Sequence, residues 1–125
     1  MSALLQVAIG GAVGASARYL TGLLMLRAFG QTPFPLAILS VNVLGSFLMG
    51  VFVVAASHRG LTHLSPLVMT GLLGGFTTFS AFSLETVTLW ERGATAQAAL
   101  YVVASVCLSV AGLVAGIAVA RALFP

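Results

Sequence analysis

Residues 71–80 read Gly71-Leu72-Leu73-Gly74-Gly75-Phe76-Thr77-Thr78-Phe79-Ser80 and lie in the middle of an apolar run from about Pro66 to Trp90. Three glycines and two threonines make this stretch a poor helix former. One interpretation is close packing, because Gly71 and Gly75 form a G-x-x-x-G pair that lets membrane helices approach. The other is a broken helix, which lipid tolerates only where protein or a water-filled cavity satisfies the freed backbone groups. Broken helices commonly carry ion sites on those freed carbonyls.

This run is the third of four apolar stretches, and each is long enough for a spanning helix of about 20 residues. Their apolar residues do not alternate as in the strands of a membrane barrel. We therefore predict an all-α integral membrane protein: a single four-helix transmembrane domain over residues 1–125, with the third helix broken at mid-span. The segment Ser57–Ser65 is expected to be a polar loop. The predicted helices cover about 4–29, 36–56, 66–90 and 94–123.

The composition supports this class. Of 125 residues, 60% are hydrophobic and 6% are charged, which excludes a water-soluble enzyme and leaves no room for a second domain. The positive net charge comes from five arginines against two glutamates without a basic cluster, so a nucleic-acid partner is not expected. A single cysteine, Cys107, excludes an intrachain disulfide. The first charge, Arg18, lies inside an apolar run, so we read the N-terminus as a retained first span.

The ionisable residues do not suggest a catalytic site. The only acids are Glu85 and Glu91, and the two histidines, His58 and His63, fall in the predicted 57–65 loop. No carboxylate or thiol lies near these histidines in the sequence, so they are not expected to bind a metal. The chain is therefore not predicted to be an enzyme.

The arginines are balanced between the two sides of the membrane. With four spans, Arg59 and Arg121 lie on the side of the N-terminus, and Arg27 and Arg92 lie on the other side. The positive-inside rule needs an excess of basic residues to fix an orientation. Either the span boundaries misplace the arginines or the chain inserts both ways. Insertion in both directions would permit a dual-topology antiparallel homodimer.

Two kinds of side chain in the spans could face an ion. Asn42 is an amide within the second span: it forms an interhelical hydrogen bond, or its NH₂ group faces a pathway as a donor for an anion. Phe79 and Phe82 lie three residues apart on one helical face just after the glycines. Such rings usually face lipid or the core, but their positive edges can line an anion path.

Two further features of the spans are polar. Tyr101, Ser105 and Ser109 recur every four residues, so their hydroxyls stack on one helical face. They form a polar track, or the serines bond to their own helix or pack as small residues. Arg18, deep in the first span, extends to the membrane surface or faces a vestibule, where it would attract anions.

Three segments resemble the Fluc (also called CrcB) family of fluoride channels. The third segment is the most specific of them, and the similarity in length, number of spans and motif order covers the whole chain. The segments are Gly10-Gly11-Ala12-Val13-Gly14-Ala15-Ser16-Ala17-Arg18-Tyr19, Asn42-Val43-Leu44-Gly45-Ser46-Phe47 and Gly74-Gly75-Phe76-Thr77-Thr78-Phe79-Ser80-Ala81-Phe82.

The resemblance implies a fluoride-selective channel of the bacterial inner membrane that exports fluoride passively and forms antiparallel homodimers with two pores. It also implies a structural sodium ion at the dimer centre, held by backbone carbonyls that fall on Gly74 and Thr77. Glu85 would end the hydroxyl track or, alternatively, pair with an arginine at the interface. The residues that would line each fluoride pathway are Asn42, Phe79, Phe82, Tyr101, Ser105 and Ser109.

Two other functions stay open. A small multidrug transporter also has four spans and dual topology, but it needs an acid embedded in the membrane, and Glu85 lies near the end of the third span. A non-transporting assembly subunit would show no ion flux. Fluoride efflux from liposomes separates the three functions.

Overall fold

The computed structural model describes residues 1–125, and all of its regular secondary structure is helical. Four segments are long and apolar enough to cross a membrane, as predicted, and the third of them consists of several shorter pieces. The elements are α1 (Ala3–Phe29), α2 (Leu36–Arg59), a 3₁₀ turn η1 (Thr62–Leu64), a π-helix η2 (Pro66–Leu73), α3 (Gly74–Phe76), α4 (Phe79–Glu91) and α5 (Thr95–Leu123).

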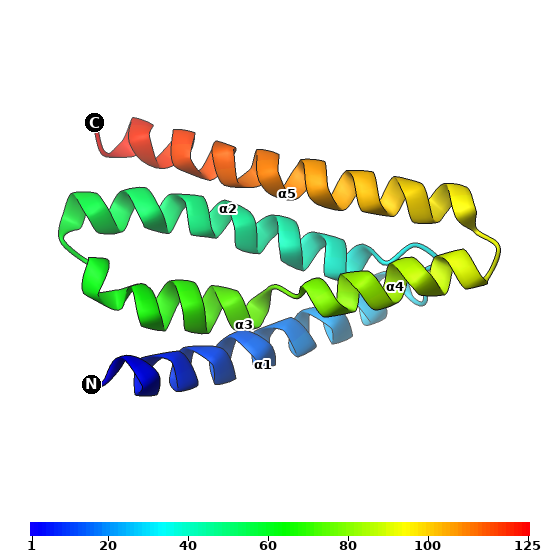
Figure 1. Ribbon diagram of the computed structural model, residues 1–125, viewed down its shortest axis with the longest axis horizontal. Coiled ribbons are helices and arrows are strands. Elements are labelled where there is room, and N and C mark those ends of the chain that lie inside the picture. The colour runs from blue at the N-terminus through cyan, green and yellow to red at the C-terminus, as the bar shows by residue number, and fades with distance from the viewer.

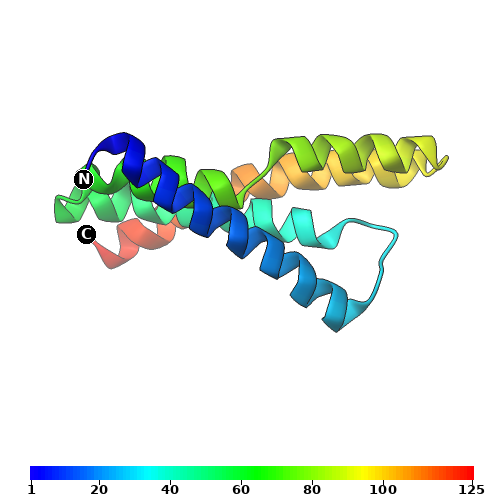
Figure 2. The ribbon, with the colours of Figure 1, turned by 90° about the horizontal axis from the view of Figure 1, so that it is seen from below.

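The four spans run side by side, and both chain termini lie at one end of the molecule (Figure 1). Helix α5 packs along α2, whereas α1 packs against η2 and α3. Beyond this contact α1 and α4 diverge, so that the far end of the molecule is splayed (Figure 2). The chain therefore consists of two packed pairs of helices: α1 with the first half of the third span, and α2 with α5.

Glycines set the distance between the paired helices. A β-carbon at Gly10 or Gly14 of α1 would overlap backbone atoms of η2, including the Leu72 carbonyl oxygen opposite Gly14. On the other pair, a β-carbon at Gly116 of α5 would overlap the Phe47 carbonyl oxygen of α2. Lipid tails give apolar helices no hydrophobic reason to associate, so close backbone packing supplies much of the attraction. The G-x-x-x-G pairs thus act as helix contacts.

The third span is interrupted at the threonines and not at the glycines. Gly74 keeps helical dihedral angles (φ −65°, ψ −36°), and the α-helical backbone continues to Phe76. Thr77 (φ −80°, ψ 157°) and Thr78 (φ −152°, ψ 118°) are extended, and α4 begins directly after them. The predicted interruption is confirmed, but the predicted stretch was wider and included the glycines. Glycine lowers helix propensity, yet in this span the glycines stay helical because they allow close packing against α1.

The predicted loop over Ser57–Ser65 is wrong in its extent. Helix α2 continues through Arg59 and ends at Gly60, which has a positive φ of 68° and whose N–H donates to the Ala56 carbonyl. A 3₁₀ turn then leads into the third span. Polar residues mark where the chain leaves the apolar layer, but they do not have to leave the helix there.

A matched pair of glycines on α1 tests this packing. We expect Gly14→Ala to destabilise the protein by about 1–3 kcal/mol, because the added methyl group overlaps η2. Gly22→Ala, two turns later on the same helix, meets no atom within contact distance. It should be neutral or stabilise the helix by up to about 1 kcal/mol. Unfolding of the purified variants in mixed detergent measures both, and equal stability of the two variants would contradict the packing.

Candidate functional site

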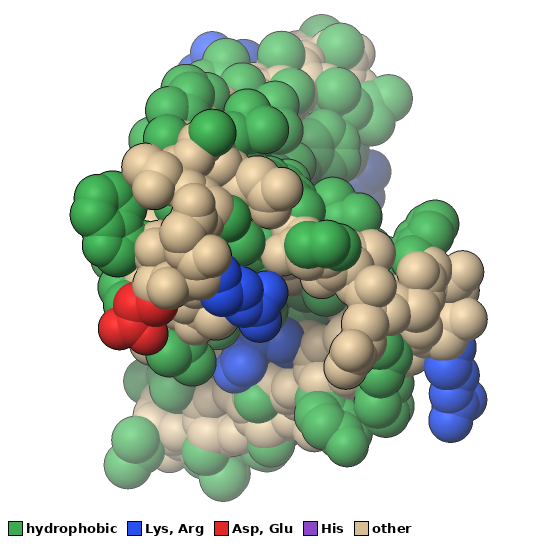
Figure 3. All heavy atoms as spheres, turned by 90° about the vertical axis from the view of Figure 1, so that its right-hand side faces the viewer, with side chains coloured by type: hydrophobic (Ala, Val, Ile, Leu, Met, Phe, Trp, Pro, Cys, Tyr) green, Lys and Arg blue, Asp and Glu red, His purple; other side chains and the backbone are tan.

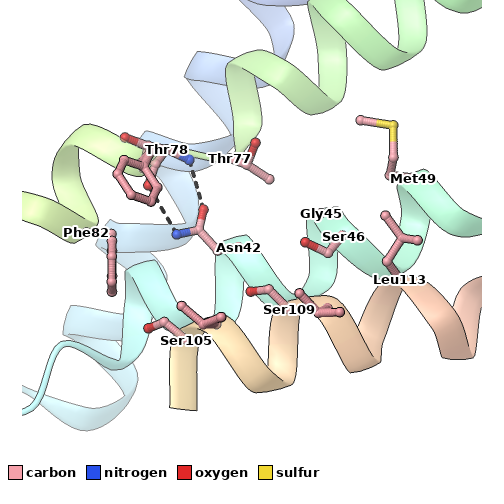
Figure 4. Close-up of a pocket in the computed structure, with 13 residues that line it drawn as sticks. Asn42, Gly45, Ser46, Met49, Thr77, Thr78, Phe82, Ser105, Ser109 and Leu113 are labelled. Carbon is pink, nitrogen blue, oxygen red and sulfur yellow. Dashed lines mark hydrogen bonds between the residues drawn. The ribbon is translucent and has the colours of Figure 1, made fainter. Parts of the chain in front are cut away.

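A groove of about 400 Å³ opens beside the break in the third span, between α2, α5 and the start of α4 (Figure 4). It brings together five of the six residues predicted to line an ion path, from three different spans. Tyr101 does not line the groove but lies directly behind Phe82. The five residues are Asn42, Phe79, Phe82, Ser105 and Ser109.

Asn42 joins α2 to the break. Its side-chain Nδ2 donates to the Thr78 carbonyl (3.1 Å), and its Oδ1 accepts from the Thr78 N–H (2.8 Å). The Thr78 hydroxyl in turn accepts from the Ala81 N–H and caps α4 (3.1 Å). The structure thus shows the interhelical hydrogen bond that the sequence left open for Asn42. This bonding uses one of the two amide hydrogens, and the side chain lines the groove.

The same hydrogen bonds leave carbonyl oxygens free at the end of the first half of the span. In an unbroken helix the Thr78 N–H would donate to the Gly74 carbonyl, but here it donates to Asn42. The Thr77 carbonyl accepts no hydrogen bond from the chain. Gly74 is exposed on the surface of the single chain. The break therefore presents oxygen ligands of the kind that suit a hard cation.

Arg18 of α1 binds the backbone of the third span. Its Nε donates to the Gly75 carbonyl (3.3 Å), so α1 supplies a cation to the end of the first half-helix. A positive charge is favourable at the C-terminal end of a helix, where carbonyl oxygens carry partial negative charge. Arg18 thereby satisfies a backbone group that the break exposes.

The two phenylalanines have different surroundings. Phe79 is 77% exposed and Phe82 is 9% exposed, with their ring centroids 5.3 Å apart. Phe82 also packs against Tyr101, at 5.3 Å between ring centroids. One ring is therefore fixed in the core of the chain, while the other projects from its surface.

The Ser105 hydroxyl on α5 is available for binding. Ser105 is 6% exposed, and its Oγ has no hydrogen-bond partner. Ser16 and Ser83 bond to carbonyls of their own helices, but Ser105 does not. This contrast removes the back-bonding alternative for Ser105, and a buried hydroxyl without a partner is costly unless a ligand supplies one.

Tyr101 and Glu85 continue the polar residues toward the splayed end. Tyr101 is fully buried, and its hydroxyl donates to Glu85 Oε2 (2.9 Å). The alternative expectation for Glu85, an arginine partner, is not what the structure shows. The Glu85 carboxylate is therefore hydrogen-bonded to the first member of the hydroxyl track.

Seven further groove residues were not assigned a role from the sequence, and four of them show why. Thr78, which anchors Asn42 and caps α4, was hidden within the stretch of poor helix formers. Ser46 follows Asn42 by four residues, and this spacing could have placed it on the same face of α2. Met49 and Leu113 are apolar, and nothing in the sequence distinguishes them from other membrane residues.

Comparisons with known proteins agree with this architecture. Residues 5–117 match the family described as CrcB-like protein, Camphor Resistance (CrcB). The chain is 67% identical over 117 residues to a "Fluoride-specific ion channel FluC" of Ruegeria sp. (strain TM1040), covering 94% of this chain and 93% of that protein. It is 66% identical over 125 residues to the protein of the same name from Roseobacter denitrificans, covering 99% of each chain. This multi-pass membrane protein therefore belongs to the CrcB family.

Proposed function

We propose that this chain is a fluoride-specific ion channel in the bacterial plasma membrane and that the groove beside the break is part of its pathway. The relatives named above carry this function in their names. The observation that carries the pathway is the buried Ser105 hydroxyl, which has no partner in the chain and lies beside Asn42 and Phe82 in the groove. The channel carries an ion passively across the membrane and catalyses no reaction.

The lining fits a small, strongly hydrated anion. Removing water from fluoride is costly, so a path must offer hydrogen-bond donors in its place. Ser105, Ser109 and the second amide hydrogen of Asn42 are such donors. The edges of Phe79 and Phe82 add weaker attraction. No full positive charge lines the groove, which is favourable because conduction requires that the ion can also leave.

We propose that two copies assemble as an antiparallel homodimer. The arginines of the two ends balance, which supports insertion in both directions. The exposed ring of Phe79 and the exposed backbone at Gly74 lie next to the break, where a second copy would cover them. A two-fold axis through this face would bring two breaks together.

The proposed sodium ion lies where two such breaks meet. The carbonyl oxygens of Gly74 and Thr77 would hold it, two from each subunit. These oxygens fit because the Thr77 carbonyl has no donor within the chain and Gly74 has lost its usual one to Asn42. The cation is structural: it neutralises the carbonyls and joins the subunits.

Fluoride efflux from liposomes that contain the purified protein tests the pathway. We expect efflux from the wild type and a loss of about tenfold in Ser105→Ala, the effect of one hydrogen bond to a charged group. Phe82→Ile should also reduce efflux, because it removes the ring edge and keeps most of the bulk. Thr88→Val is the matched control, since that hydroxyl already bonds to the Leu84 carbonyl of its own helix. Full efflux in Ser105→Ala would remove this hydroxyl from the pathway, and no efflux from the wild type would contradict the channel function.

Orientation can be tested by adding charge to one end. Reporter fusions at the C-terminus should show both orientations in the wild type. Lysines at the exposed positions Leu61 and His63 should shift the reporter to one side, because they give that end an excess of basic residues. Lysines at Thr95 and Gln97 should shift it to the other side. A single orientation of the unaltered chain would exclude the antiparallel dimer.

Sodium removal tests the cation site. Replacing sodium by N-methylglucamine on both sides should lower fluoride efflux and reduce chemical crosslinking of the dimer, because a ligand that binds only the assembled state stabilises it. Gly74→Val should have the same two effects. Within the single chain a β-carbon at this position would meet one atom closely, the Met69 carbonyl oxygen at 3.3 Å. Thr77→Ser should retain sodium dependence, since the backbone oxygen is unchanged. An undiminished dimer in sodium-free buffer would mean that no cation joins the breaks.

A further inference from the structure

A second groove lies at the splayed end of the molecule, away from the break. It has a volume of about 510 Å³ and is enclosed by the last turns of α1, the 30–35 loop, the first turn of α2 and Arg92 from the turn between α4 and α5. We call it the interfacial groove. Figure 3 looks onto this end and shows basic side chains around a hollow, with an acidic patch to one side.

One part of the interfacial groove offers unpaired hydrogen-bond donors. The Arg92 guanidinium makes no hydrogen bond within the chain, in contrast to Arg18, which binds a carbonyl. Gln31 and Thr32 line the same groove, and their backbone N–H groups donate to no acceptor in the chain. The two acids of α4, Glu85 and Glu91, do not line the groove. These donors form a site for an anion.

The other part of the groove is apolar and lies at the end of the first span. Met25, Leu26 and Phe29 of α1 line it together with Pro33 and Leu36. Trp90, 63% exposed, lies two residues before Arg92, as is common where helices leave the hydrocarbon layer. A ligand that fills the groove must therefore be anionic at one end and apolar at the other.

We propose that the interfacial groove binds an anionic phospholipid, with the phosphate at Arg92 and the 31–32 amides and an acyl chain along Phe29 and Met25. An inorganic phosphate would satisfy the donors but would leave the apolar wall uncovered. The choline of a zwitterionic lipid would bring a second cation close to Arg92. A net charge of +3 on the chain further favours an anionic lipid.

Native mass spectrometry of the delipidated full chain in detergent tests this site, with phosphatidylglycerol and phosphatidylcholine as probes. The wild type should bind phosphatidylglycerol more tightly than phosphatidylcholine. Arg92→Gln should weaken phosphatidylglycerol binding by about tenfold, because a charge-assisted hydrogen bond is lost. Gly22→Leu should also weaken it. This position lines the groove, and a β-carbon there meets no atom within 4 Å, so the larger side chain would occupy part of the groove.

Arg27→Gln is the matched control, because Arg27 lies at the same end, carries the same charge and does not line the groove. It should leave lipid binding unchanged, although it removes the same charge from the same end as Arg92→Gln. Equal weakening by Arg27→Gln would mean that general attraction between a basic protein and an anionic lipid explains the binding, and it would overturn the proposed site. Displacement of the lipid by inorganic phosphate at equal concentration would show a free-anion site in its place. Equal binding of the two lipids would also overturn the proposal.

Discussion

A backbone polar group in the middle of a membrane needs a partner, and the Thr77–Thr78 break exposes several of them at once. Two neighbouring helices and a side chain of the break itself supply the partners. Asn42 of α2 binds both backbone groups of Thr78, Arg18 of α1 binds the Gly75 carbonyl, and the Thr78 hydroxyl caps α4. The break thus dictates which side chains on the neighbouring spans must be polar, and it fixes the helices that carry them.

The break also explains how a cation site and an anion path can adjoin. The first half of the third span ends at the break with its carbonyl oxygens, which carry partial negative charge, whereas α4 begins there with its N–H groups, which carry partial positive charge. The proposed sodium ion would adjoin the first end and the proposed fluoride path the second. One interruption therefore gives a chain with few charged residues two local fields of opposite sign.

The sequence predicted the four spans because apolar length alone identifies them, and it placed the interruption within ten residues. It did not identify the residues at which the helix is interrupted. Glycine lowers helix propensity but allows helices to pack closely, and which effect prevails here depends on the contact with α1. It also predicted five of the residues in the groove, since polar and aromatic side chains stand out in apolar spans. The partner of Arg18 and the interfacial groove depend on how helices diverge in space, which no local pattern encodes.

The lengths of the helices bear on the thickness of the bilayer that suits this protein. Helix α5 has 29 residues and α1 has 27. At a rise of about 1.5 Å per residue both reach about 40 Å or more, which exceeds a hydrocarbon core of about 30 Å. Tilt and protrusion into the headgroup layer must absorb the difference, at a cost that grows with each ångström of mismatch. A thin membrane would therefore force the helix pairs to lean further, and the splay between α1 and α4 makes that end of the molecule the part most able to adjust.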